Sequence, residues 1–196
     1  MSLVGLVICD DGIVGIGDYK SSCSTIGNFK FKQKNRDVEK IFKNNNFILA
    51  TYGANSYFDL DDEKYLETAI LKHLSPDDSI DAFFSVLTKE LASMNSKYNF
   101  LLGFKDRDSV YHLMEVEINN GTFTKKFIFD NYIFGGDSNY YNPMCSLYID
   151  VTKGADVVAK KLEKALKALI EFRSVEDKYQ SVGLSSKGEV NIKIFK

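Results

Sequence analysis

The sequence lacks the features that mark membrane-spanning, secreted or disulfide-rich proteins. No apolar run among its 196 residues approaches the ~20 that a membrane-spanning helix needs. Its start has no basic segment followed by a long apolar one, so we expect no signal peptide. The three cysteines are an odd number and form no Cys-x-x-Cys pair. This favours a reduced, cytoplasmic protein over a disulfide framework.

Strong charge and clustered metal ligands are missing too. The net charge is −2 and the isoelectric point about 5.8, which gives no reason to expect nucleic acid as a partner. The two histidines, His73 and His112, lie far apart and neither has a ligand-spaced partner, so we expect no metal site. The stretch "GIVGIGDYK" contains G-x-G but no third glycine in register, and it lies in a predicted hairpin, so we expect no nucleotide cofactor.

Apolar patterning predicts one α+β domain over residues 1–196, in the order strands, two helices, strands, one helix, strands. Helical spacing of apolar residues predicts helices over 65–74, 80–94 and 157–170, with Ser79 as the N-cap of the second. The acidic cluster at 59–63 is expected to open the first helix. Apolar runs bounded by turn residues predict strands at 4–9, 13–16, 40–42, 47–52, 98–104, 110–118, 122–129, 132–134, 179–182 and 189–195.

Two blocks of the sequence point to a known family. The segment "SLVGLVICDDGIVGIGDYKS" is a strand, a hairpin and a second strand that ends in Asp-x-Lys. The segment "EKIFKNNNFILATYGAN" places a lysine before a strand pair and a glycine just after it. Together they resemble the catalytic β subunits of the proteasome and bacterial HslV, which are N-terminal nucleophile hydrolases. The resemblance implies a four-layer αββα sandwich.

The resemblance also implies catalytic roles. Ser2 falls where the family has its N-terminal nucleophile, and its own α-amine would act as the general base. Lys40 would lower the pKa of the Ser2 hydroxyl, Asp18 would hold Lys40, and an N–H near Ala54 would stabilise the oxyanion. Asp177 is the counterpart of a late aspartate of the family. Met1 precedes Ser2, so the scheme requires its removal.

The same resemblance implies a substrate pocket and partners. Ser21, Phe42 and Tyr52 would line the pocket for the residue before the cleaved bond, and the bulk of Tyr52 would make it shallow. The substrate would be a peptide. Members of the family stack into rings, so self-association is expected, and no cofactor is implied.

Two other hypotheses remain open. The first is a catalytically inactive relative that keeps the fold for assembly or partner binding, with Asp18 and Lys40 as a structural ion pair. The replacement of the usual double glycine by "GAN" favours it. The second is an unrelated sandwich that binds a small ligand, which a large separation of Asp18 and Lys40 would support.

Overall fold

The computed structural model describes residues 3–20, 37–59, 62–92, 96–136, 149–150, 152–176 and 183–196. Its helices are α1 (Leu66–His73), α2 (Ile80–Leu91) and α4 (Ala155–Glu176). Its strands are β1 (Leu3–Cys9), β2 (Gly12–Gly17), β3 (Ile41–Lys43), β4 (Phe47–Gly53), β5 (Ser56–Asp59), β6 (Asp62–Tyr65), β7 (Tyr98–Lys105), β8 (Tyr111–Asn119), β9 (Thr122–Ile128), β10 (Tyr132–Gly136) and β11 (Asn191–Phe195).

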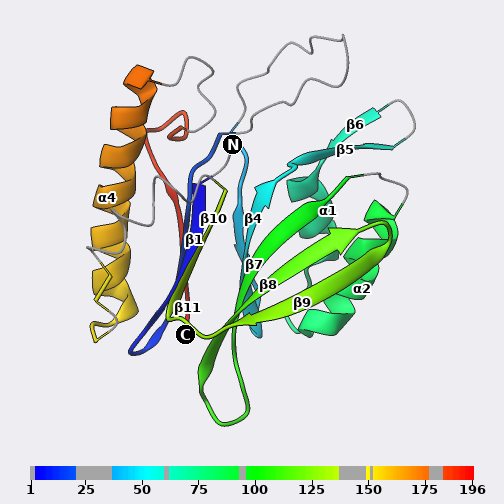
Figure 1. Ribbon diagram of the computed structural model, residues 1–196, viewed down its shortest axis with the longest axis horizontal. Coiled ribbons are helices and arrows are strands. Elements are labelled where there is room, and N and C mark those ends of the chain that lie inside the picture. Colours follow the sequence, from blue (N-terminus) through cyan, green and yellow to red (C-terminus); the bar gives the residue numbers. More distant parts are fainter. Residues whose placement is uncertain are drawn as a thin grey trace.

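Two antiparallel sheets organise these strands (Figure 1). One has four strands in the order β10-β1-β2-β11, and the other has five in the order β3-β4-β7-β8-β9. The short ribbon β5-β6 extends from the end of the five-stranded sheet. Tight turns connect β1 to β2 and β8 to β9, and each pairs a strand with the one that follows it.

Alternating side chains divide the core into three apolar layers. In β4, Phe47 and Leu49 pack with α1 and α2, whereas Ile48 and Ala50 face the four-stranded sheet. The outer face of the four-stranded sheet packs against α4, which lies along it in Figure 1. The two sheets pack against each other through these apolar side chains. This packing fixes the position of the end of β2 relative to the start of β3.

The predicted fold class was wrong. The sequence analysis expected an α+β chain folded as a four-layer αββα sandwich. Strands instead hold 43% of the structure and helices 26%, so the chain is mostly β and is built on two antiparallel sheets. Among the described residues, α4 alone covers the outer face of the four-stranded sheet. The α+β class had come from the predicted order of strands and helices, and the four-layer sandwich from the family resemblance; neither accounted for how far antiparallel strand pairing dominates the structure.

Most individual elements were predicted correctly. The described strands and all three described helices match predicted ranges, apart from β5 and β6. Ser79 caps α2, where its Oγ accepts a hydrogen bond from the Ala82 N–H at 3.3 Å. The acidic cluster does not open a helix, because residues 56–59 and 62–65 pair as the β5-β6 ribbon. The predicted strand at 179–182 lies outside the described residues, as do residues 21–36.

No helix within the described part of the chain has the length and apolar character that crossing a bilayer requires. The described residues also include no group of three or more histidine, cysteine or acidic side chains that could hold a metal ion.

Candidate active site

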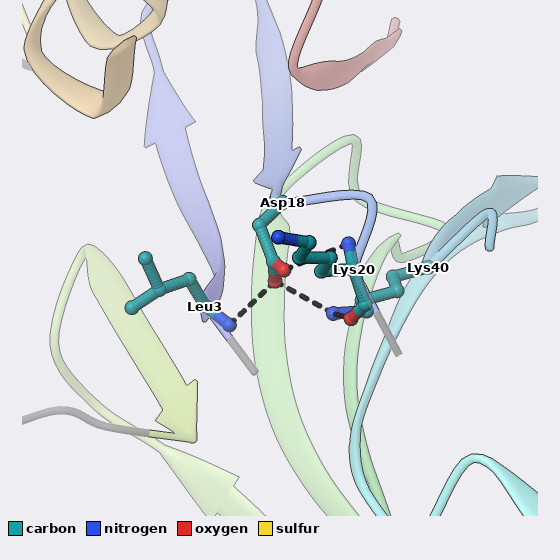
Figure 2. A network of polar contacts seen from close by, with 4 residues as sticks. All are labelled: Leu3, Asp18, Lys20 and Lys40. Carbon is teal, nitrogen blue, oxygen red and sulfur yellow. Dashed lines mark hydrogen bonds and ion pairs between the residues drawn. The ribbon is translucent and has the colours of Figure 1, made fainter. Parts of the chain in front are cut away.

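The site is built around the carboxylate of Asp18, which follows the last residue of β2. Its Oδ1 accepts the Leu3 N–H at 2.8 Å and the Lys40 Nζ at 2.7 Å (Figure 2). Its Oδ2 accepts the Lys20 N–H at 3.0 Å. The carboxylate is fully buried and accepts three hydrogen bonds, as a buried charge requires.

Antiparallel pairing brings the N-terminal end of β1 to this carboxylate. Val4 pairs with Gly17, and the Asp18 N–H donates to the Leu3 carbonyl at 2.8 Å. The Leu3 nitrogen that Asp18 holds is bonded to the carbonyl carbon of Ser2. Ser2 itself lies outside the described residues, but its covalent neighbour is fixed at the site.

Lys40 lies just before β3, and its side chain is fully buried. Its Nζ donates to Asp18 Oδ1 and to the Lys20 carbonyl oxygen (Figure 2). Burial lowers the pKa of Lys40, and the negative charge of Asp18 opposes that shift. An ammonium has three donors, and two of them have these acceptors among the described residues.

Asn191, at the start of β11, was missed by the sequence analysis. It is 1% exposed and pairs with Gly17 in the four-stranded sheet. In the amide orientation that satisfies both donors, its Oδ1 accepts the Lys40 N–H at 2.9 Å and the Ile41 N–H at 3.2 Å. Asn191 therefore connects the backbone of Lys40 to the four-stranded sheet, next to the end of β2 that precedes Asp18. No local motif signals this contact, because Asn191 is about 150 residues away in sequence.

The C-terminal segment braces the site at two more points. The Tyr19 N–H donates to the Gly183 carbonyl at 3.0 Å. The carboxylate of Asp37 accepts the N–H of Ser186 at 2.9 Å and its hydroxyl at 2.7 Å. Residues on both sides of the segment 21–36 are thus held by the last described stretch of the chain.

Ala54 lies at the far end of β4 and follows Gly53, whose φ of +85° suits glycine. The Thr51 N–H donates to the Lys40 carbonyl at 2.9 Å, so the end of β4 is hydrogen-bonded to the start of β3. Ala54 itself is partly buried against the cluster around α1 and α2. Ala54 is three residues along the chain from Thr51, whose N–H makes the direct contact with Lys40.

The structure does not bring the predicted pocket residues together. Phe42 is 1% exposed and packs in the cluster under α1 and α2. Tyr52 points from the opposite face of the same sheet, toward the four-stranded sheet. A single pocket lined by both is therefore not formed. Ser21 and Asp177, like Ser2, lie outside the described residues.

Tyr52 connects the two sheets beside the site. Its ring lies so close to Gly135 that a Cβ there would be 2.6 Å from the ring. Its hydroxyl donates to Glu115 Oε1 at 3.4 Å, and burial together with the charge of Glu115 raises its pKa to about 12. Gly135 in turn pairs with Val4, next to the Leu3 that Asp18 holds.

The sequence alone matches neither a protein-family profile nor a curated protein. The fold does match solved structures. Anbu (ancestral beta-subunit) from Yersinia bercovieri aligns with a TM-score of 0.54 and 14% identity, over 98% of this chain and 80% of that one. Anbu from Hyphomicrobium sp. strain MC1 aligns with a TM-score of 0.57 and 14% identity, over 99% of this chain and 82% of that one. A Gly-1 mutant of Anbu from Hyphomicrobium sp. strain MC1 aligns with a TM-score of 0.56 and 12% identity, over 94% of this chain and 78% of that one.

The chain therefore shares its fold with these Anbu structures. The resemblance to proteasome β subunits and HslV is corrected by this finding, because the neighbours are Anbu proteins, a distinct proteasome-like family, and a likeness to HslV is not shown. Identities of 12–14% carry the likeness at the level of fold alone.

Proposed function

We propose that this protein is an amide hydrolase that cleaves peptides with an N-terminal serine, Ser2, as its nucleophile. One observation carries the proposal. Asp18 Oδ1 holds both the backbone nitrogen that follows Ser2, at 2.8 Å, and the Lys40 ammonium, at 2.7 Å. A single oxygen atom therefore sets the position of the chain next to Ser2 relative to a buried positive charge.

The chemistry begins once Met1 has been removed. The free α-amine of Ser2, with an ordinary pKa of roughly 7.7–8.0, takes the hydroxyl proton as Oγ attacks the peptide carbonyl carbon. The Ala54 N–H donates to the resulting oxyanion. The protonated amine then gives its proton to the leaving nitrogen, which breaks the C–N bond and leaves an acyl ester on Oγ. Water hydrolyses that ester and restores the enzyme.

Lys40 acts through its charge. Its ammonium lowers the pKa of the nearby hydroxyl, and Asp18 together with the Lys20 carbonyl orients it. Because the pair is buried, little water screens that charge.

A second candidate is an inactive, self-associating assembly module. The observation that favours it is the separation of Phe42 and Tyr52 onto opposite faces of one sheet, which removes the predicted substrate pocket. In that case the Asp18–Lys40 pair serves only to join β1, β2 and β3. Homo-oligomerisation is compatible with both candidates and is measured by native mass spectrometry.

The deciding experiment uses protein whose fusion partner is cut off to leave Ser2 first. This protein is treated with a peptide epoxyketone, which reacts with an amine and a hydroxyl on the same residue. We expect a stoichiometric mass adduct on the Ser2-first protein. Protein that retains Met1 and the variant Ser2→Ala are matched controls and should stay unmodified. A folded, Ser2-first protein that forms no adduct and cleaves no peptide would leave the inactive module as the function.

A further inference from the structure

The inner face of the five-stranded sheet changes from apolar to polar toward one end. Where the four-stranded sheet covers it, this face carries Ile48, Ala50, Leu101 and Leu113. Strand register then aligns a polar row across four strands, in the order Tyr52, Asn99, Glu117 and Thr124. Glu115 and Lys126 form the next row on the same face.

These two rows line a pocket of about 260 Å³. In Figure 1, β8 and β9 extend away from the four-stranded sheet. Lys97, just before β7, and Val116 complete the lining. A sheet face is apolar where a hydrophobic core covers it. Hydrophobic burial therefore does not explain why these charged side chains gather on this part of the face.

The charges in the pocket differ in how firmly they are held. Glu115 and Glu117 are on the strand β8, and their side chains are 36% and 34% exposed. The lysine ammonium groups stand at the ends of long side chains that are 76% exposed for Lys126 and 55% for Lys97. The fixed charge of the pocket is therefore negative, and the positive charge is the part that can move away.

Among the described residues, Glu115 has longer contacts than Glu117. Its Oε1 accepts the Tyr52 hydroxyl at 3.4 Å, and its Oε2 is 3.8 Å from the Lys126 Nζ. Both separations are long for a carboxylate, which forms charge-assisted bonds at about 2.7–2.9 Å. By contrast, Glu117 has a close partner in Lys97 at 2.6 Å.

We propose that this pocket binds a cationic side chain, lysine or arginine, of a peptide substrate, with Glu115 as the principal acceptor and Glu117 as the second. An incoming ammonium or guanidinium replaces the Lys126 head group at Glu115 without any movement of the sheet. As a statement about substrates, this inference rests on the hydrolase function proposed above.

Tyr52 connects the pocket to the active site. Its hydroxyl contacts Glu115, while its ring packs on Gly135, whose strand partner Val4 adjoins Leu3. A peptide whose basic side chain occupies the pocket would therefore lie next to Tyr52, on the side of the sheet that faces the N-terminal end of β1. The pocket would make the enzyme selective for peptides with a basic residue near the cleaved bond.

Binding can be tested without catalysis. The full chain with Met1 attached cannot turn over a peptide by the proposed mechanism, so amide chemical shifts can be followed during titration. The probes are acetyl-Gly-Arg-Gly-amide, its uncharged citrulline analogue and acetyl-Gly-Glu-Gly-amide. We expect the arginine peptide alone to shift the amides of Asn99, Glu117 and Thr124.

Three variants sharpen the result. Glu115→Gln should weaken the arginine peptide about tenfold or more, since it removes a charge-assisted bond. Lys126→Met should strengthen it, because the competing ammonium is gone. Glu163→Gln is the matched control, since it removes a lysine-paired carboxylate of α4 (Lys167 at 2.8 Å), and should change nothing.

Two outcomes would overturn the inference. Binding of the glutamate peptide in preference to the arginine peptide would mean that the lysines recognise the ligand. Saturating arginine peptide without shifts in the pocket would mean that the charges are only a solvated surface. Either result leaves the epoxyketone test of Ser2 unaffected, so the pocket and the hydrolase function fail separately.

Discussion

Asp11 and Asp18 stand at the two ends of β2, and each carboxylate binds a lysine and the backbone N–H of a distant residue. Asp11 Oδ1 accepts the Ala155 N–H at the start of α4 at 2.6 Å, and its Oδ2 is 3.1 Å from the Lys196 Nζ. Asp18 accepts the Leu3 N–H and the Lys40 Nζ at similar distances. The contacts are alike, but the Asp11–Lys196 pair is about half exposed and the Asp18–Lys40 pair is fully buried.

This difference in burial separates an ordinary surface contact from a candidate active site. Water screens the Asp11–Lys196 pair, so either charge can lose its partner at little cost. At the other end of β2, a charge without its partner would remain buried away from water. Such a pair persists only where the surroundings hold it in place. Here Asn191, Leu3 and the Lys20 backbone do so.

The largest effect should come from Lys40→Met. The substitution leaves the Asp18 carboxylate buried without its counter-ion, and we expect a loss of about 3–5 kcal/mol in the free energy of unfolding. Urea denaturation followed by circular dichroism measures it. The equivalent change at the exposed end, Lys196→Met, should leave the denaturation midpoint close to that of the original chain.

A double variant checks the cause of that loss. Asp18→Asn combined with Lys40→Met removes both charges, so it should be more stable than Lys40→Met alone. If Lys40→Met unfolds at the same urea concentration as the original chain, the buried pair does not contribute to stability and the contrast between the two ends of β2 disappears.

A smaller effect is expected from Asn191→Ala. It leaves the N–H groups of Lys40 and Ile41 buried without an acceptor, which should cost about 1–3 kcal/mol in the free energy of unfolding. Hydrogen exchange distinguishes this cause from general loosening, because the two amides should lose protection before the rest of β3 and β4. Asn191→Asp keeps an oxygen that can accept from both N–H groups and serves as the control. Unchanged exchange at Lys40 and Ile41 would contradict the assigned contact.

The sequence made much of this picture predictable where the signals were local. Apolar runs bounded by turn residues located β1, β2, β4 and β7, and Asp18 and Lys40 were expected to share a site, as they do. That expectation came from the family resemblance, which assigned Asp18 and Lys40 to one site.

Long-range contacts could not be predicted in the same way. Asn191 reaches Lys40 only because β11 pairs with β2, and a lone asparagine near the end of the chain has no distinctive pattern. The separation of Phe42 and Tyr52 depends on which face of a strand each occupies, and the family-based pocket ignored that parity. The acidic residues around Asp59 have a composition suited to a helix start, but they pair as a ribbon.

The most subtle expected effect concerns acid stability at the exposed end of β2. The hydrogen bond from the Ala155 N–H, followed by that from Lys196, holds the pKa of Asp11 below its ordinary value of 3.8. A carboxyl whose pKa is lower in the folded chain adds stability above its unfolded pKa, and that stability is lost as the pH falls through the folded value. Asp11→Asn should therefore lower the urea midpoint at pH 7, and the gap to the original chain should begin to close below pH 3.8 and be lost once the pH is below the folded pKa. A gap between the two midpoints that stays constant from pH 7 down to acid pH would mean that the charge of Asp11 is irrelevant and that Asp11 acts through hydrogen bonding to α4. That result would remove the electrostatic likeness between Asp11 and Asp18.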